Sequence, residues 1–378
     1  MKRAYCILSA TLISSALLVT NGALSADTPL GLPPLIVPVD NEITEAKVAL
    51  GTKLFEDSRF SSTGEVSCAT CHDSDSGFTD SPKVVSEGIH QLTGTRNAPT
   101  VINAAYMKLQ FWDGREPDLE SQSAQPFLNP VEMGLTSHEP ILEVVRNDRA
   151  YRRMVRRAFS IDPDDVTMDH VQKAIASFER TIISGNSPFD RYRYGGDETA
   201  MSEAAIRGLE VFEDDGRCVS CHTISQSFAL FTDGKFHNLN VSFDRISEGI
   251  GNLTQAYSER REAGTNLNVD VLTEADVSEL GRFAVTGEWT DTGAFKTSTL
   301  RNIEVTAPYM HDGSQETLED VVDFYNNGGA VNEGDPINDF QSSGIRPLDL
   351  TDQQKLDLVE FMKALTSPEY ASSGIAED

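Results

Sequence analysis

The sequence predicts a mainly α-helical protein built from two similar domains. Apolar residues recur at three- and four-residue spacing in 139–159, 168–183, 204–214 and 352–365, a period typical of amphipathic helices. Strand-like alternation is barely signalled. Two stretches also match in content and order, "ALGTKLFEDSRFSSTGEVSCATCH" and "RGLEVFEDDGRCVSCH". Each reads as a helix followed by a cysteine motif, which indicates an internal duplication.

The repeat continues after the cysteines. "TRNAPT" and "FWDGREPDLE" follow in the first unit, and "LRNIEVTAPYMHDGSQETLED" follows in the second. We interpret each as an Arg-Asn turn and an Asp-Gly turn before another helix. A Gly-, Ser- and Asp-rich stretch lies between the units and predicts a boundary near Gly195. The expected domains are therefore 27–195 and 196–378.

The C-terminal part of the second unit has two further signals. Thr351 is a good N-cap for the last helix. The Asn-, Gly- and Asp-rich stretch 326–349 is expected to be a solvated loop, although its acids could also bind a cation.

The first 26 residues have the layout of a secretory signal peptide. Lys2 and Arg3 precede an apolar run, and small residues lead to Ala26. The apolar run is too short to cross a bilayer comfortably, and no later segment approaches the ~18 consecutive apolar residues of a transmembrane helix. We therefore expect a soluble protein that is exported to the periplasm, with no membrane partner.

The chain is strongly acidic. Its formal net charge is −28, and removal of the signal peptide, which carries two basic residues and no acidic one, makes it −30. Nucleic acid is a poor partner for such a field, whereas a cationic protein would be steered toward it.

Four cysteines remain after Cys6 leaves with the signal peptide. They form "CATCH" (Cys68, Cys71, His72) and "CVSCH" (Cys218, Cys221, His222). This spacing attaches c-type haem through two thioethers, and the histidine supplies the proximal nitrogen. Disulfides, redox motifs or zinc sites are the alternatives for an exported chain. A histidine directly after both motifs favours two covalently bound haem c groups.

The two motifs, together with "RNAPT", "FWDGREPDL", "NPVEMG" and "LRNIEVTAPYMHDG", resemble the bacterial dihaem cytochrome c peroxidase and MauG superfamily. The resemblance runs from about Ala46 to Leu365. It implies two cytochrome c-like domains, each wrapped around one haem, and an enzyme that uses hydrogen peroxide.

The resemblance also assigns a peroxide site at the N-terminal haem. Counting from Trp112 in "QFWDGR", Gln122 and Glu132 fall on the Gln and Glu that line the open face of this haem in the family. Cleavage of a peroxide requires a proton to move between its two oxygens, and a carboxylate can carry it. From residue type alone, Glu132 would more often be a surface carboxylate.

Two features are expected between the haems. Trp112 resembles the indole that relays electrons in relatives; the alternative is a core aromatic, and one residue can have both roles. A calcium ion is implied at Asn97, Thr306 and Pro308, which match a family site made of one Asn side chain and two backbone carbonyls.

Two residues compete for the second axial position of the C-terminal haem. The family register places Tyr325 there, as in MauG, with Met310 packed nearby. The alternative is a core Tyr325 with Met310 as the ligand. A neutral Met raises a haem's reduction potential, whereas a phenolate should lower it.

The other histidines are expected to play lesser roles. His90 lies one residue out of register with a loop histidine that caps the peroxide haem in many relatives, and we favour an uncapped haem. His237 and His311 should form hydrogen bonds near the C-terminal haem rather than ligate it. The surface Trp that precedes the second motif in MauG is absent here.

The sequence therefore predicts a periplasmic dihaem peroxidase of the MauG-like type. Oxidising equivalents would pass through Trp112 to the C-terminal haem, and the partner would be a small cytochrome c or cupredoxin, or a protein substrate to be oxidised. The alternatives are a plain cytochrome c peroxidase that detoxifies peroxide and a non-catalytic dihaem electron-transfer cytochrome.

Overall fold

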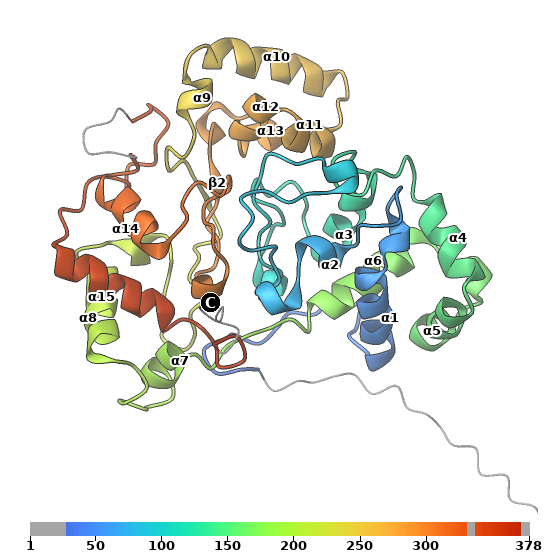
Figure 1. The fold of residues 1–378 in the computed structure, drawn as a ribbon, viewed down its shortest axis with the longest axis horizontal. Helices are drawn as coiled ribbons and strands as arrows, with labels where there is room; N and C mark the ends of the chain where they lie inside the picture. Colours follow the sequence, from blue (N-terminus) through green and yellow to red (C-terminus); the bar gives the residue numbers. More distant parts are fainter. Residues whose placement is uncertain (1–27, 331–336, 372–378) are drawn as a thin grey trace, which may run out of the picture.

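The computed structural model describes residues 28–330 and 337–371. The predicted signal peptide, residues 1–26, lies outside the described residues. Within the described ranges the chain is mainly α-helical, as the sequence predicts, and its strands are two residues long (Figure 1). None of the described helices is long and apolar enough to cross a membrane.

The first half of the chain is organised around a pair of packed helices. They are α1 (Glu45–Glu56) and α6 (Met168–Glu179), against which α3 (Leu119–Leu128) and α5 (Arg149–Phe159) also pack. Their buried faces form one hydrophobic core. This core supports the first haem motif, since α2 (Cys68–Cys71) follows α1 and contacts it.

The periodic stretch 139–159 is two helices in the structure, α4 (Glu139–Asn147) and α5. Asp148 between them has an extended backbone (φ −73°, ψ 126°), and its carboxylate accepts hydrogen bonds from two backbone N–H groups of α5. Asp is favoured at such N-caps because it satisfies these otherwise free donors. The apolar period hides the break because both helices contribute to the same core.

The second half repeats this plan. Helix α8 (Glu203–Glu213) packs against α15 (Asp352–Lys363), and α14 (Leu318–Asn326) packs against α15 as well. Thr351 caps α15 as predicted, with its hydroxyl accepting a hydrogen bond from the backbone nitrogen of Gln354. Phe189, which precedes the predicted boundary near Gly195, packs in this second core, and the boundary stays a prediction. Phe189 lies on the remaining helix, α7 (Pro188–Arg193).

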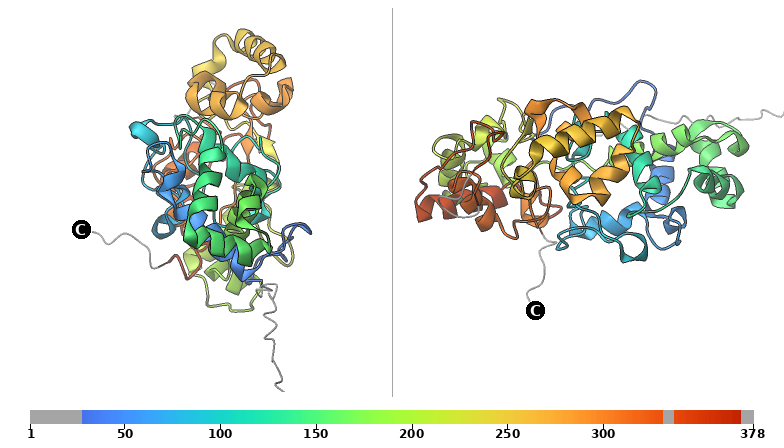
Figure 2. Two further views of the ribbon diagram at one scale, coloured as in Figure 1. Left: turned by 90° about the vertical axis from the view of Figure 1, so that its right-hand side faces the viewer. Right: turned by 90° about the horizontal axis from the view of Figure 1, so that it is seen from above.

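An inserted segment separates the second haem motif from α14. It begins at β1 and ends at β2, which pair antiparallel, and its helices have a small core of their own. Figures 1 and 2 show these helices standing beyond the two halves, at the top of Figure 1. The elements are β1 (Phe236–His237), α9 (Asp244–Ser247), α10 (Ile250–Glu262), α11 (Leu267–Thr273), α12 (Ala275–Glu279), α13 (Phe283–Thr286) and β2 (Phe295–Lys296).

Short 3₁₀ helices complete the described part of the chain. They lie at Ser58–Phe60, Ser74–Ser76, Ile89–Gln91, Ala104–Tyr106, Pro163–Asp165, Cys218–Ser220, Trp289–Asp291 and Ile303–Val305.

A glycine marks the equivalent helix crossing in each half. A Cβ at Gly51 of α1 would collide with the carbonyl oxygen of Ala174 in α6, and a Cβ at Gly208 of α8 would collide with that of Asp357 in α15. Both crossings therefore require the backbones to approach more closely than any side chain permits. The shared constraint supports the predicted duplication.

The predicted register of the Arg-Asn turns is wrong. Asn302 corresponds to Asn103 and not to Asn97, because both have left-handed backbone angles (φ 62° at Asn103 and 59° at Asn302) before a 3₁₀ turn. Their backbone nitrogens also donate to equivalent carbonyls, those of Ile182 and Leu365. The structurally equivalent pairs are Ile102-Asn103 in the first unit and Arg301-Asn302 in the second. A match by residue type therefore pairs Asn302 with Asn97, because Asn97 follows an arginine and Asn103 does not.

An extended N-terminal segment, residues 28–43, links the two halves. The carbonyl oxygen of Gly31 accepts a hydrogen bond from Arg301 Nη2 at 2.7 Å, and Asn41 Nδ2 donates to Glu120 Oε1 of α3 at 2.7 Å. Arg301 also forms a fully buried ion pair with Asp190 at 2.8 Å. Buried charges are tolerated when paired and hydrogen-bonded in this way.

Candidate active site

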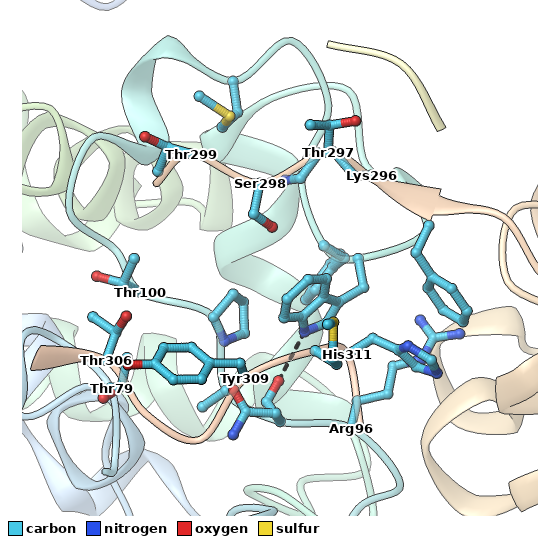
Figure 3. Close-up of a pocket in the computed structure, with 18 of the residues that line it drawn as sticks. Thr79, Arg96, Thr100, Lys296, Thr297, Ser298, Thr299, Thr306, Tyr309 and His311 are labelled. Carbon is cyan, nitrogen blue, oxygen red and sulfur yellow. Dashed lines mark hydrogen bonds between the residues drawn. The ribbon is translucent and has the colours of Figure 1, made fainter. Parts of the chain in front are cut away.

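One cavity of about 420 Å³ lies between the halves and reaches both cysteine motifs. Its volume is in the range of cofactor sites. In Figure 3 the stretch Lys296–Thr299 forms one wall, and Thr79, Thr100, Arg96, Thr306, Tyr309 and His311 lie on the opposite side. The residues predicted for four roles also line this cavity: Gln122 and Glu132 for peroxide chemistry, Trp112 for electron relay, Asn97, Thr306 and Pro308 for calcium, and Met310 and Tyr325 for axial ligation.

The two motif histidines are held in the same orientation. His72 Nδ1 donates to the carbonyl oxygen of Phe78 at 3.1 Å, and His222 Nδ1 donates to that of Phe231 at 2.8 Å. Nε2 of each ring is thus left for a metal. Burial lowers the pKa of both imidazoles, which favours the neutral form that coordinates iron.

The residues around the cavity fit two covalent haems. The four motif cysteines form no disulfide, so their sulfurs are available for thioether bonds. Haem carries two propionates, and cationic groups line the cavity to meet them. Arg217 Nη1 is buried without a hydrogen-bond partner among the described residues, and the ammonium of Lys296 has its pKa lowered to about 8 by burial.

Glu132 faces the cavity near the first motif. It lies in the turn after α3, and its backbone nitrogen donates to the carbonyl oxygen of Asn129 at 3.2 Å. Burial raises the pKa of Glu132 to about 7, and the positive charge of Arg115 opposes this rise. A carboxyl that titrates near neutral pH can both accept and return a proton. Gln122, on α3, lines the same cavity.

Trp112 is fixed by hydrogen bonds that connect the halves. Its indole Nε1 donates to the carbonyl oxygen of Asn97 at 2.9 Å, and its own carbonyl oxygen accepts from the backbone nitrogen of Lys296 at 2.8 Å. The backbone nitrogen of Asn97 donates in turn to the carbonyl oxygen of His311. The indole is therefore held at the junction of the two halves, on the cavity wall.

The structure brings the three predicted calcium residues to this junction. Asn97, Thr306 and Pro308 all line the cavity. Asn97 Nδ2 donates to the carbonyl oxygens of Lys83 and Val84. Three residues before Lys83, both carboxylate oxygens of Asp80 are buried without a hydrogen-bond partner in the described structure. Unpaired buried carboxylate oxygens fit a site for a hard cation.

Both candidates for the second axial ligand face the cavity. Met310 lies in a turn with a left-handed backbone (φ 71°), and Tyr325 lies on α14. Burial raises the pKa of Tyr325. Tyr325 and Cys218 of the second haem motif pack against the same hydrophobic core and line the same cavity.

The remaining histidines differ in position. His90 is exposed and lies in a 3₁₀ turn, outside the residues that line the cavity. His237 Nε2 bonds Asp233 Oδ2, and His311 Nε2 bonds Glu279 Oε2, both at 2.9 Å. Both of these imidazoles line the cavity and are hydrogen-bonded, as expected; that neither ligates haem iron stays a prediction.

Sequence matches to known proteins agree with two haem sites in this chain. Residues 45–199 match the family described as di-haem cytochrome c peroxidase. Cytochrome-c peroxidase IdrP1 of Denitromonas iodatirespirans is 34% identical over 349 residues, which cover 90% of this chain and 87% of the relative. The methylamine utilization protein MauG of Methylorubrum extorquens is 34% identical over 329 residues, covering 87% and 80%. The chain belongs to the di-haem cytochrome c peroxidase and MauG family. This dihaem peroxidase is thus an oxidoreductase with c-type haem.

Solved structures have the same fold. A MauG-like protein associated with microbial copper homeostasis has a TM-score of 0.75 and 31% identity, covering 92% of this chain and 97% of that chain. The diheme peroxidase BthA from Burkholderia thailandensis, at 22% identity, has a TM-score of 0.65 and covers 91% and 96%. The dihaem peroxidase is confirmed as a mainly α protein of this architecture.

Sequence reasoning missed several residues of the dihaem peroxidase cavity. Arg115 lines the cavity together with Glu132, although the sequence predicts no role for it. Glu179 on α6 has its pKa raised to about 8 by burial, and its Oε2 has no hydrogen-bond partner within the described residues. The strongly acidic composition gave no sign that cations gather in the cavity. Only the position of Arg115, directly after the Asp-Gly turn, could have pointed to it.

Proposed function

We propose that this protein is an exported, periplasmic dihaem peroxidase that reduces hydrogen peroxide at the haem attached to Cys68 and Cys71. His72 would hold the iron of that haem, and His222 with Tyr325 would hold the iron of the second. When bound, the haems supply the one-electron chemistry of iron. Overall, one peroxide, two protons and two electrons give two waters.

Glu132 is the group that moves the proton. Its carboxylate would accept the proton of the peroxide oxygen nearer the iron and return it to the outer oxygen, which leaves as water. The pKa of about 7 suits both transfers at neutral pH, because neither form of the carboxyl is strongly favoured. Gln122 would orient the peroxide through its amide but could not replace the carboxyl.

Trp112 would connect the two haem sites. The indole lies on the cavity wall at the junction of the halves, and its hydrogen bond to Asn97 fixes its orientation. An aromatic side chain in this position can carry an oxidising equivalent from one haem to the other. We further propose calcium at Asn97, Thr306 and Pro308, where it would hold the halves at a fixed separation.

The electron donor or protein substrate would dock through charge. The net charge of −28 favours a cationic partner, such as a small cytochrome c or cupredoxin. A Tyr ligand, rather than Met, would make the second haem a weaker electron acceptor, and this favours the MauG-like role over plain peroxide detoxification.

The observation that carries the proposal is the partly buried Glu132, which lines the cavity together with the first motif. Replacing Glu132 by Gln should lower the rate of reaction with hydrogen peroxide by about 10²- to 10⁴-fold, measured by stopped-flow absorption in the Soret region. Glu65→Gln, at an exposed carboxylate near the same motif, is the matched control. A Glu132→Gln protein with full reactivity would instead favour a non-catalytic electron-transfer cytochrome.

A further inference from the structure

The inserted segment reaches back to the proposed peroxide site in the first half of the chain. Helix α11 contributes Leu272 to the cavity wall, and the preceding turn of this helix carries Asn268. The side chain of Asn268 contacts residues that lie more than 140 positions earlier. The first unit of the duplication has no equivalent of this inserted segment between its haem motif and its Asp-Gly turn.

The side-chain amide and the backbone oxygen of Asn268 form hydrogen bonds on the peroxide side. Its Oδ1 accepts a hydrogen bond from Arg115 Nε at 2.6 Å, and its Nδ2 donates to Gln125 Oε1 at 3.0 Å. Its backbone oxygen accepts from Asn129 Nδ2 at 2.7 Å. One residue therefore holds the Arg115 side chain, helix α3 and the turn that follows α3.

These partners determine where Glu132 and its neighbouring charge lie. The carbonyl oxygen of Asn129 accepts from the backbone nitrogen of Glu132, and Asn129 Oδ1 accepts from the backbone nitrogen of Val131 at 3.0 Å. Asn129 thus shapes the turn that presents Glu132. Rotation of the Asn129 side chain is in turn restricted by its bond to Asn268.

Arg115 lines the same cavity as Glu132, and its positive charge lowers the pKa of that carboxyl. Its Nη1 donates to Asp113 at 3.1 Å, and its guanidinium lies 3.5 Å from the centre of the Phe111 ring. The Nε of Arg115 donates its hydrogen bond to Asn268. The other titratable groups with an electrostatic effect on Glu132 are Cys68 and Cys71 of α2, and their sulfurs would be uncharged as thioethers.

We propose that Asn268 is a positioning residue for the peroxide site, which fixes Arg115 and the Glu132 turn relative to each other from the second half of the chain. The inference rests on the proposed role of Glu132. It means that the peroxide site of the first haem is complete only when the inserted segment is docked. Without Asn268, Arg115 keeps its contacts with Asp113 and Phe111 but loses the hydrogen bond to its Nε, so its position shifts and the carboxylate form of Glu132 loses part of the charge effect that favours it.

The test is the pH dependence of cyanide binding to the fully ferric protein, which does not involve turnover. Hydrogen cyanide must give up a proton as it binds, so the binding rate follows the carboxylate form of Glu132. In Asn268→Ala the midpoint of this profile should move up by about one pH unit, part of the 1–3 units that a close opposite charge contributes. Reaction with hydrogen peroxide at pH 7 should then slow about fivefold.

Two variants control for loss of structure. Asn266→Ala removes an exposed Asn just before the same helix and should leave the midpoint unchanged. Asn268→Ser keeps a polar group but is too short to reach Arg115, and it should give the same shift as Asn268→Ala. In an Arg115→Lys background, Asn268→Ala should produce no further shift, because the two residues act through one contact.

The outcomes are distinguishable. An unshifted profile in both Asn268 variants, or an equal shift in Asn266→Ala, would overturn the positioning role. If Glu132→Gln keeps the wild-type profile, the proposed function itself fails. If Glu132→Gln abolishes the pH dependence while the Asn268 variants behave as wild type, only the inference about Asn268 fails.

Discussion

Pro126 and Tyr325 occupy the same position in the two halves of the protein. Helix α3 begins at Leu119 and helix α14 at Leu318, each after an Asp-Gly turn and an N-cap residue. The eighth residue of the helix is therefore Pro126 in α3 and Tyr325 in α14. Both residues line the cavity. Proline offers no metal ligand, whereas tyrosine offers a phenolate oxygen. The duplicated helix is thus suited to leave one iron open and to close the other.

Replacing Tyr325 by Met should raise the reduction potential of the C-terminal haem. A neutral thioether stabilises ferrous iron more than a phenolate does, and an increase on the order of 100 mV is expected within the roughly 0.8 V that axial ligands span. Spectroelectrochemical titration measures it. Met310→Leu is the matched control, and a potential that changed with Met310→Leu but not with Tyr325→Met would identify Met310 as the ligand.

The rate of reaction with peroxide should rise with pH through a midpoint near 7. The base form of Glu132 accepts the first proton, and burial raises the pKa of this carboxyl to about 7, so the base form is scarce at pH 5 and dominant at pH 9. Stopped-flow measurements over this range test the expectation. A rate that is constant across the range would show that another group accepts the proton.

The glycine crossings predict a stability effect in each half. Gly51→Ala or Gly208→Ala should destabilise the fold by about 1–3 kcal/mol, since the added methyl group pushes two packed helices apart. Urea unfolding of the haem-loaded protein measures the change. Gly251→Ala, in α10 with open space around it, should be neutral or stabilising by up to about 1 kcal/mol. Equal losses at all three positions would contradict the crossing argument.

Removal of calcium should lower the thermal stability of the protein. At a free calcium concentration 100-fold above Kd, binding contributes about 2.7 kcal/mol. Chelation should therefore lower Tm, and added Ca²⁺ but not Mg²⁺ should restore it. Asn97→Ala should have the lower Tm at the outset and respond little to chelation. A wild-type Tm that is insensitive to chelation would argue against the site.

Helices and haem motifs could be predicted from sequence because their signals are local. The apolar period of 352–365 and the N-cap at Thr351 define α15 without reference to its neighbours. The break at Asp148 could not be predicted, because the apolar period continues across it. The register of the repeat failed for a related reason: Asn103 and Asn302 share a backbone conformation, while Asn97 and Asn302 share only a residue type.

The site was predictable where a residue carries its own chemistry. Gln122 and Glu132 are expected at the N-terminal haem and Trp112 between the two haems, and all three line one cavity. The near-neutral pKa of Glu132 follows from burial, which depends on the tertiary fold. Arg115 and Asn268 act through contacts between residues far apart in the chain, and no local pattern distinguishes them from surface polar residues.

The extended N-terminal segment sets a constraint on the order of folding. The carbonyl oxygen of Gly31 is bound by Arg301, 270 residues later, so this contact can form only after most of the chain has been synthesised. Until Arg301 is available, this segment has no partner for that contact, and its attachment requires the closure of a very long loop. Such long-range contacts slow folding. Formation of the contact between Gly31 and Arg301 would therefore report that the N-terminal segment has docked on the second half.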